Sequence, residues 1–155
     1  MPAPMADDHP PPAKRAPRIL IDDRQSDLVD VGALRALAAR CLTNEGIANA
    51  ELSVSFVTEE EIADLHERYM HEEGPTDVLS FPLGDDAGAD GVRVLGDVVI
   101  APSVAARNRP DDPASEIRLL LVHGILHLLG HDHMGVEEKA EMWARQERYS
   151  GVSVR

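Results

Sequence analysis

Hydrophobic and polar residues alternate along the chain with two different periods, which separate predicted strands from predicted helices. The period of two is clearest where Leu52, Val54 and Phe56 alternate with Ser53 and Ser55, as expected for a strand with one face buried. The predicted strands are 18–23, 50–58, 76–82 and 92–101.

Apolar residues at helical spacing, together with residues that favour helix ends, predict five helices. Thr58 and Glu61 have the spacing of an N-terminal capping box, and Gly130 ends the most apolar helix. That helix is apolar on nearly every side, so we expect it to run through the core. The predicted helices lie within 28–46, 59–70, 102–108, 114–129 and 136–148.

The order of these elements, with strands early and helices late, predicts an α+β fold. We expect a small mixed central sheet packed with about five helices. A chain of 155 residues suits a single domain. We place this domain at residues 17–150, after a proline-rich disordered tail (1–16) and before a short tail (151–155).

Charge and cysteine content narrow the class of protein. The chain has 28 acidic and 15 basic residues and a net charge of -13, which argues against a general nucleic-acid binder. Its one cysteine excludes an internal disulfide and fits a reducing compartment. No secretory signal pattern is visible and no apolar stretch is long enough to span a membrane. We therefore expect a cytoplasmic protein with no membrane partner.

The segment "HGILHLLGHDH" (123–133) holds four of the seven histidines. His123 and His127 are four residues apart, so both project from one face of a helix. Gly130 can reverse the chain at the helix end, which brings His133 back towards the pair. Metzincin metalloproteases space three zinc-binding histidines and a glycine in this way. The spacing predicts a metal site at the end of the core helix, with His131 as the histidine that does not bind.

Three imidazoles leave one position of a tetrahedral zinc ion for water, as in catalytic zinc sites. We expect one Zn²⁺ per chain, because the sequence contains a single such cluster. Gly124 occupies the position at which the proteases carry their glutamate general base. The metal chemistry is therefore expected, but peptidase activity is not.

The same segment resembles the H-G-x-L-H-L-x-G-x-D-H signature of the YbeY family of metal-dependent endoribonucleases. The blocks "GPTDVLSFP" (74–82) and "LGDVVIA" (95–101) agree as well, and the likeness covers about residues 18–149. The resemblance implies zinc held by His123, His127 and His133 in a cleft beside a small sheet. It also implies cleavage of single-stranded rRNA precursors, 16S rRNA 3′-end processing, ribosome quality control, and contact with the small ribosomal subunit or its assembly factors.

One position departs from the family pattern, which usually has an arginine where this chain has Met70. Arg68 is a candidate substitute for binding phosphate, although two residues along a helix turn the side chain by about 200°. A solvated helix charge is the alternative. Asp132 is a candidate to orient an imidazole or accept a proton, and an ordinary turn carboxylate is its alternative.

Two other functions remain open at this stage. One is a ribosome-associated factor whose zinc is mainly structural, and the other is a different hydrolase with a three-histidine metal site. Four arginines flank the predicted site in sequence and are the available cations for RNA if they converge. They are Arg93, Arg107, Arg109 and Arg118.

Overall fold

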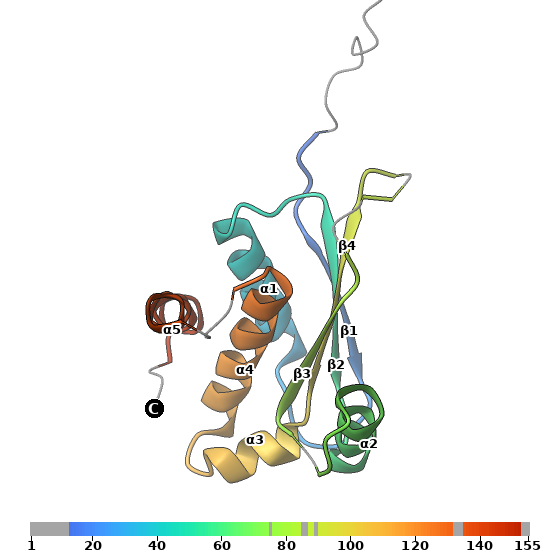
Figure 1. Cartoon of the computed structure of the whole chain (residues 1–155), viewed down its shortest axis with the longest axis vertical. Coiled ribbons are helices and arrows are strands. Elements are labelled where there is room, and N and C mark those ends of the chain that lie inside the picture. Colours follow the sequence, from blue (N-terminus) through green and yellow to red (C-terminus); the bar gives the residue numbers. More distant parts are fainter. Residues whose placement is uncertain (1–12, 75, 85–86, 89, 132–134, 153–155) are drawn as a thin grey trace, which may run out of the picture.

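A four-stranded mixed sheet forms the centre of the protein (Figure 1), seen here in a computed structural model that describes residues 13–74, 76–84, 87–88, 90–131 and 135–152. The strands are β1 (Arg18–Asp23), β2 (Ala50–Phe56), β3 (Val78–Pro82) and β4 (Arg93–Ile100). Their order across the sheet is β1-β2-β4-β3. β1, β2 and β4 run parallel, and β3 pairs with β4 in the antiparallel direction.

Helices cover both faces of this sheet. They are α1 (Val31–Asn44), α2 (Glu59–Met70), α3 (Pro102–Asn108), α4 (Pro113–Leu128) and α5 (Val136–Ser150). α1 and α4 lie on one face, with α5 outside them, and α2 lies on the other face (Figure 1). Five helices around a small mixed sheet confirm the predicted α+β fold.

Side chains of β4 alternate between the two cores because successive residues of a strand point to opposite faces. Val98 and Ile100 belong to the larger core, which includes buried residues of α1 and α4. Val99 belongs to the smaller core, with Ile62 of α2. Burial on both faces explains why "DVVI" has little polar alternation.

Local signals set the helix starts. Asp30 caps α1 through a hydrogen bond from the amide of Ala33 to its carboxylate (3.1 Å). The apolar run begins earlier, at Leu28, but that side chain is 98% exposed and lies outside the helix. Thr58 accepts a hydrogen bond from the amide of Glu61 (3.1 Å), which confirms its predicted role as the cap of α2.

α4 approaches the sheet closely at Gly124. A β-carbon built at this position would lie 2.7 Å from Cγ1 of Val98 and 3.2 Å from Oγ of Ser80. The Ser80 hydroxyl also donates to the Gly124 carbonyl (3.1 Å). The position that carries the general base in metzincins is therefore a packing contact here, with no room for a side chain.

Gly124→Ala is expected to destabilise the fold by roughly 1 kcal/mol, since overpacking costs about 1–3 kcal/mol and alanine regains about 1 kcal/mol of helix propensity. Urea denaturation of the variant and the wild type measures the difference. An unchanged midpoint would show that α4 can move away from Val98 without cost.

The ends of the described chain contact the domain. The backbone amide of Arg15 donates to Asn49 (2.8 Å), so the last residues of the predicted 1–16 tail already pack against the fold. Val152, in the predicted 151–155 tail, is 5% exposed. Within the described ranges, no helix is both long and apolar enough to cross a bilayer.

Deletion of residues 1–12 is expected to leave the melting temperature and zinc content unchanged, since a proline-rich segment of this composition buries little apolar surface. Differential scanning calorimetry and metal analysis of the truncated chain measure both. A deletion that also removes Arg15 serves as the contrast, because it breaks the bonds to Asn49. A large loss of stability in the shorter deletion would show that the segment is docked.

Candidate metal centre

His123 and His127 lie side by side on α4, as their spacing predicts. Their ring centroids are 4.5 Å apart and the ring planes make an angle of 70°. Both residues are half-buried on a helix whose other side chains nearby are buried. The core packing of α4 therefore fixes the positions from which the two imidazoles project.

Both rings line an open pocket of about 510 Å³ between α4, β3 and the end of α2. Residues of β3 form one wall of the pocket, and residues of the segment that connects α2 to β3 form a second wall. The other residues that line the pocket are His66, Met70, Glu72, Thr76, Val78, Leu79, Ser80 and Pro82. The histidine pair thus faces a space large enough for a small substrate group.

The chain reverses at Gly130, immediately after α4. Gly130 has φ of +93°, its amide donates to His127 O (3.0 Å), and the amide of His131 donates to Leu126 O (3.0 Å). These two bonds form a Schellman motif, for which a left-handed residue is required. The turn predicted from the glycine is confirmed.

The remaining predicted site residues of this segment, Asp132 and His133, lie outside the described residues. Among the residues that the structure describes, no group of three histidine, cysteine or acidic side chains is placed to hold a metal ion. The ligand set of His123, His127 and His133 therefore stays a prediction, and the turn at Gly130 is consistent with it.

His131 has a different partner. Its Nε2 lies 2.7 Å from Oε1 of Glu45, at the end of α1. Glu45 also accepts from Arg145 (2.5 Å) and Tyr149 (2.5 Å) of α5. Burial raises the pKa of the Glu45 carboxyl. The hydrogen bonds from Tyr149 and His131 and the charge of Arg145 lower this pKa by a larger amount, so that it lies below its usual range. His131 thus joins the segment after α4 to Glu45 at the end of α1, which also binds α5. This contact is consistent with its predicted exclusion from the ligand set.

His123 has a buried partner on α5. Its Nδ1 lies 2.5 Å from Oε1 of Gln146, a residue that is only 3% exposed. An amide oxygen accepts, so Nδ1 carries the proton and the lone pair of the neutral ring is on Nε2. A neutral ring in this tautomer offers the Nε2 lone pair that a zinc ion binds. The histidine pair therefore fits the expected metal.

Sequence reasoning missed His66. His66 and His71 are five residues apart, which places their side chains on different faces of a helix, so the pair does not suggest a shared ligand site. In the structure His66 lines the pocket together with Met70, four residues later on the same face of α2. Its Nδ1 lies 2.9 Å from Gly74 O, and its Nε2 lies 2.9 Å from the carboxylate of Glu72. The i,i+4 spacing to Met70 was the available signal.

Arg68 lies away from this pocket. It forms an i,i+4 ion pair with Asp64 (3.1 Å), and its side chain is 62% exposed. Met70, not Arg68, lines the pocket. The rotation of about 200° between the two positions accounts for this, and the arrangement favours the solvated-charge alternative for Arg68.

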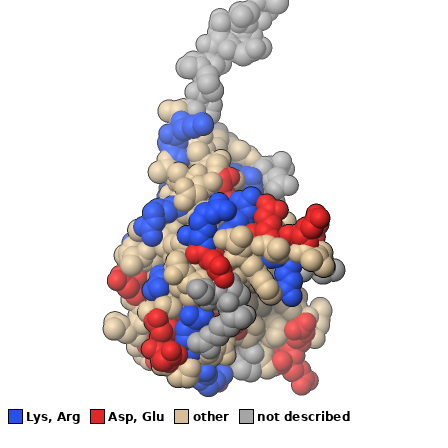
Figure 2. Space-filling model, turned by 90° about the vertical axis from the view of Figure 1, so that its left-hand side faces the viewer, with Lys and Arg blue, Asp and Glu red and all other residues tan. Residues whose placement is uncertain are grey.

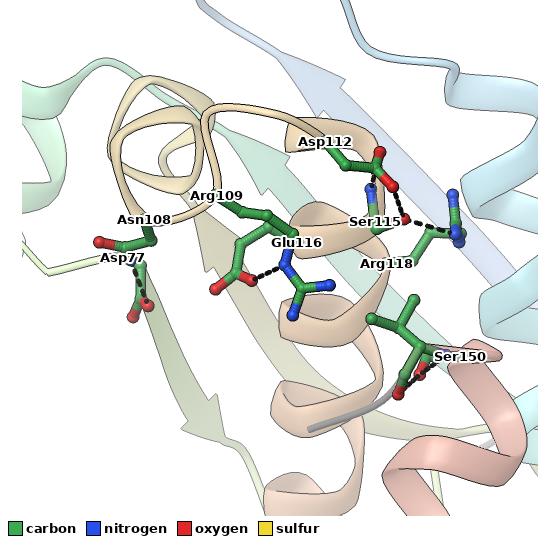
Figure 3. A network of polar contacts seen from close by, with 9 residues as sticks. Asp77, Asn108, Arg109, Asp112, Ser115, Glu116, Arg118 and Ser150 are labelled. Atoms are coloured by element: carbon green, nitrogen blue, oxygen red, sulfur yellow. Dashed lines mark hydrogen bonds and ion pairs between the residues drawn. The ribbon is translucent and has the colours of Figure 1, made fainter. Parts of the chain in front are cut away.

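None of the four flanking arginines lines the pocket, and three of them bind partners outside it. Arg109 pairs with Glu116 (3.1 Å), with both side chains nearly buried, and Arg118 donates to Ser115 (2.9 Å). Figure 3 shows these contacts around the turn between α3 and α4, where Asp112 also accepts from Ser115. Arg107 pairs with Glu59. These side chains stabilise the fold and do not form a basic floor for the pocket.

The surface outside α5 carries both signs of charge, interspersed (Figure 2). Arg40 of α1 and Arg148 of α5 line a separate hollow of about 370 Å³ with Asn44 and Tyr149. Basic residues therefore gather locally in spite of the net charge of -13. The acidic composition alone does not exclude an RNA ligand.

Comparison with known proteins gives a consistent result. The family model described as "Endoribonuclease YbeY" matches residues 20–151. A protein named endoribonuclease YbeY from Beutenbergia cavernae is 46% identical over 129 residues, which cover 77% of this chain and 86% of the relative. One from Frankia alni is 50% identical over 110 residues, covering 64% of this chain and 61% of the relative. The solution structure of TM1509 from Thermotoga maritima aligns with a TM-score of 0.56 and 27% identity, over 85% of this chain and 86% of that one.

Proposed function

Because the chain belongs to the endoribonuclease YbeY family, whose members are named as nucleases and hence hydrolytic enzymes, we propose that it is a zinc-dependent endoribonuclease. Its substrate in this proposal is single-stranded rRNA precursor, at the 3′ end of 16S rRNA, and it serves ribosome quality control. The observation that carries the proposal is the pair of adjacent imidazoles, His123 and His127, on the wall of an open pocket.

The proposed ligands are His123, His127 and His133. Zinc bound there would supply Lewis-acid activation of water and neutralise phosphate charge. α4 holds the first two rings in place, and the Schellman turn at Gly130 directs the chain that carries the third. The absence of a side chain at Gly124 removes the group that a peptidase uses to take the proton from water.

His66 is the residue that we assign to the phosphate in place of the family arginine. It lies on the pocket-facing side of α2, and its ring bonds the Gly74 carbonyl and the Glu72 carboxylate. The Glu72 side chain is 69% exposed, so a phosphate oxygen can replace its carboxylate at Nε2. Met70 adds an apolar surface beside it, and Asp132 remains a proposed proton acceptor or orienting group.

The proposal is tested by cleavage of a single-stranded RNA by the wild type and by His123→Ala, purified identically from a ribonuclease-deficient host. We expect the variant to lose activity and Arg118→Ala to keep it, because Arg118 bonds Ser115 and does not line the pocket. Circular dichroism checks that each variant is folded.

Equal cleavage by the wild type and His123→Ala would identify a contaminant and overturn the proposal. Absence of cleavage by a wild-type protein with zinc fully bound would favour the alternative in which the zinc is structural and the protein acts as a ribosome-associated factor. Cleavage of a small phosphoester but not of RNA would favour a different metal hydrolase.

RNA binding is expected to weaken as salt rises, because contacts to phosphate release counterions. Two phosphate contacts give a loss of about sevenfold between roughly 50 and 200 mM salt for a single strand. Fluorescence anisotropy with a labelled oligonucleotide measures this slope. Binding that strengthens with salt would show that repulsion by the net charge of -13 dominates, and that a partner must deliver the RNA.

A further inference from the structure

Gln146 of α5 is the buried polar residue that touches the histidine pair. Its side chain is 3% exposed, and its Oε1 lies 2.5 Å from Nδ1 of His123. A buried amide is retained in a core only where its hydrogen bonds are satisfied, because an unsatisfied one costs free energy. The contact with His123 meets this requirement for the amide oxygen, and it joins residues 23 positions apart in the chain.

We propose that Gln146 is a positioning residue for the metal site, which fixes both the tautomer and the ring orientation of His123. With Nδ1–H donating to the amide oxygen, the lone pair of the neutral ring is on Nε2. A histidine ligand whose second nitrogen is held in this way binds a metal with less loss of ring freedom and with higher basicity. This inference rests on the proposed metal site.

The position of Gln146 is itself fixed by the packing of α5. Met142, one turn earlier, is 1% exposed, and Ser150, one turn later, is 6% exposed. The Ser150 hydroxyl donates to the backbone carbonyl of Gln146 (2.5 Å). Arg145 and Tyr149 both donate hydrogen bonds to Glu45 at the end of α1. α5 is thus fixed both by its buried face and by its bonds to Glu45. This packing fixes the position of Gln146 beside His123.

Two substitutions separate this role from packing. Gln146→Met keeps the approximate volume and removes the acceptor. Gln146→Glu keeps an oxygen at the same place, and a carboxylate only accepts, so it forms the carboxylate–histidine–zinc arrangement seen in many metal sites. Met142→Ala is the matched control, because it loosens the same buried face of α5 and leaves Gln146, the hydrogen-bond partner of His123, unchanged.

The experiment measures the zinc affinity of the folded protein by competition with a fluorescent chelator, and the visible absorption of the Co²⁺-substituted protein. We expect Gln146→Met to weaken zinc binding by about 10- to 100-fold, the usual effect of losing such a partner, and to alter the Co²⁺ spectrum. Gln146→Glu should bind zinc at least as tightly as the wild type. Met142→Ala should lower the melting temperature and leave the affinity within a few-fold.

Equal affinities for Gln146→Met and the wild type would overturn the inference. So would an equal loss in Gln146→Glu, which would mean that the amide group donates to His123. A loss in Met142→Ala as large as that in Gln146→Met would assign the effect to packing and also overturn it. A wild-type protein that binds no zinc would instead refute the metal site, and with it the proposed function.

Discussion

His127→Ala is expected to lower zinc affinity by more than the roughly 100-fold that loss of an outer-shell partner can cost, since it removes a ligand directly. The wild type should hold about one zinc per chain, because one histidine cluster exists. Metal analysis after dialysis against a weak chelator measures the content. His127 lines the pocket and lies against His123, so its loss leaves too few imidazoles to retain the ion.

His131→Ala provides the contrast within the same segment. Its Nε2 lies 2.7 Å from Glu45, so its loss should lower stability while the zinc content stays near one per chain. His133→Ala should behave like His127→Ala. If His131→Ala instead loses as much zinc as His133→Ala, the assignment of ligands in this segment is wrong.

The parts of the site that the sequence predicted are set by local geometry. The spacing of His123 and His127 fixes their common face whatever the rest of the fold does. Gly130 reverses the chain through bonds within its own helix end. Strand alternation and helix caps are local as well, which is why the α+β fold was predicted from pattern alone.

Apart from His66, the parts that were missed depend on contacts between distant segments. Gln146 meets His123 across 23 residues, and Glu45 meets His131 across 86. The hydrophobic pattern of α5 does place Gln146 on the buried face, since Met142 and Ser150 lie four residues to either side. A polar residue on such a face signals a buried partner, but only the three-dimensional packing of α4 against α5 shows which one.

The partners of the flanking arginines could likewise not be predicted from the sequence. Arg109 and Arg118 flank the histidine segment, yet they bind Glu116 and Ser115 near the α3–α4 turn (Figure 3). Arg107 pairs instead with Glu59 of α2. In a chain with 28 acidic residues, a cation meets a nearby acid more readily than it joins other cations. Proximity in sequence therefore says little about a basic cleft.

Glu45→Ala is expected to destabilise the protein by roughly 2–4 kcal/mol, somewhat less than the roughly 3–5 kcal/mol for breaking a fully buried ion pair. Glu45 is 6% exposed in its side chain, but Arg145 and His131 keep exposures of 28% and 24%, so water still solvates the partners in part. Loss of the carboxylate leaves three donors on α5 and on the segment after α4 without their common acceptor. Urea denaturation at neutral pH measures the change.

The pH dependence gives the sign of this contribution. The pKa of Glu45 is lowered in the fold, because the hydrogen bonds from Tyr149 and His131 and the charge of Arg145 outweigh burial. Its stabilisation is therefore fully present above the ordinary glutamate pKa of about 4.3 and is lost as pH falls through the lower folded value. Glu45→Gln removes this titration and keeps the shape, so the stability difference from the wild type should be large at pH 7 and should shrink steadily below pH of about 4. A difference that stays constant across this range would mean that Glu45 stabilises the junction by packing alone, without its charge.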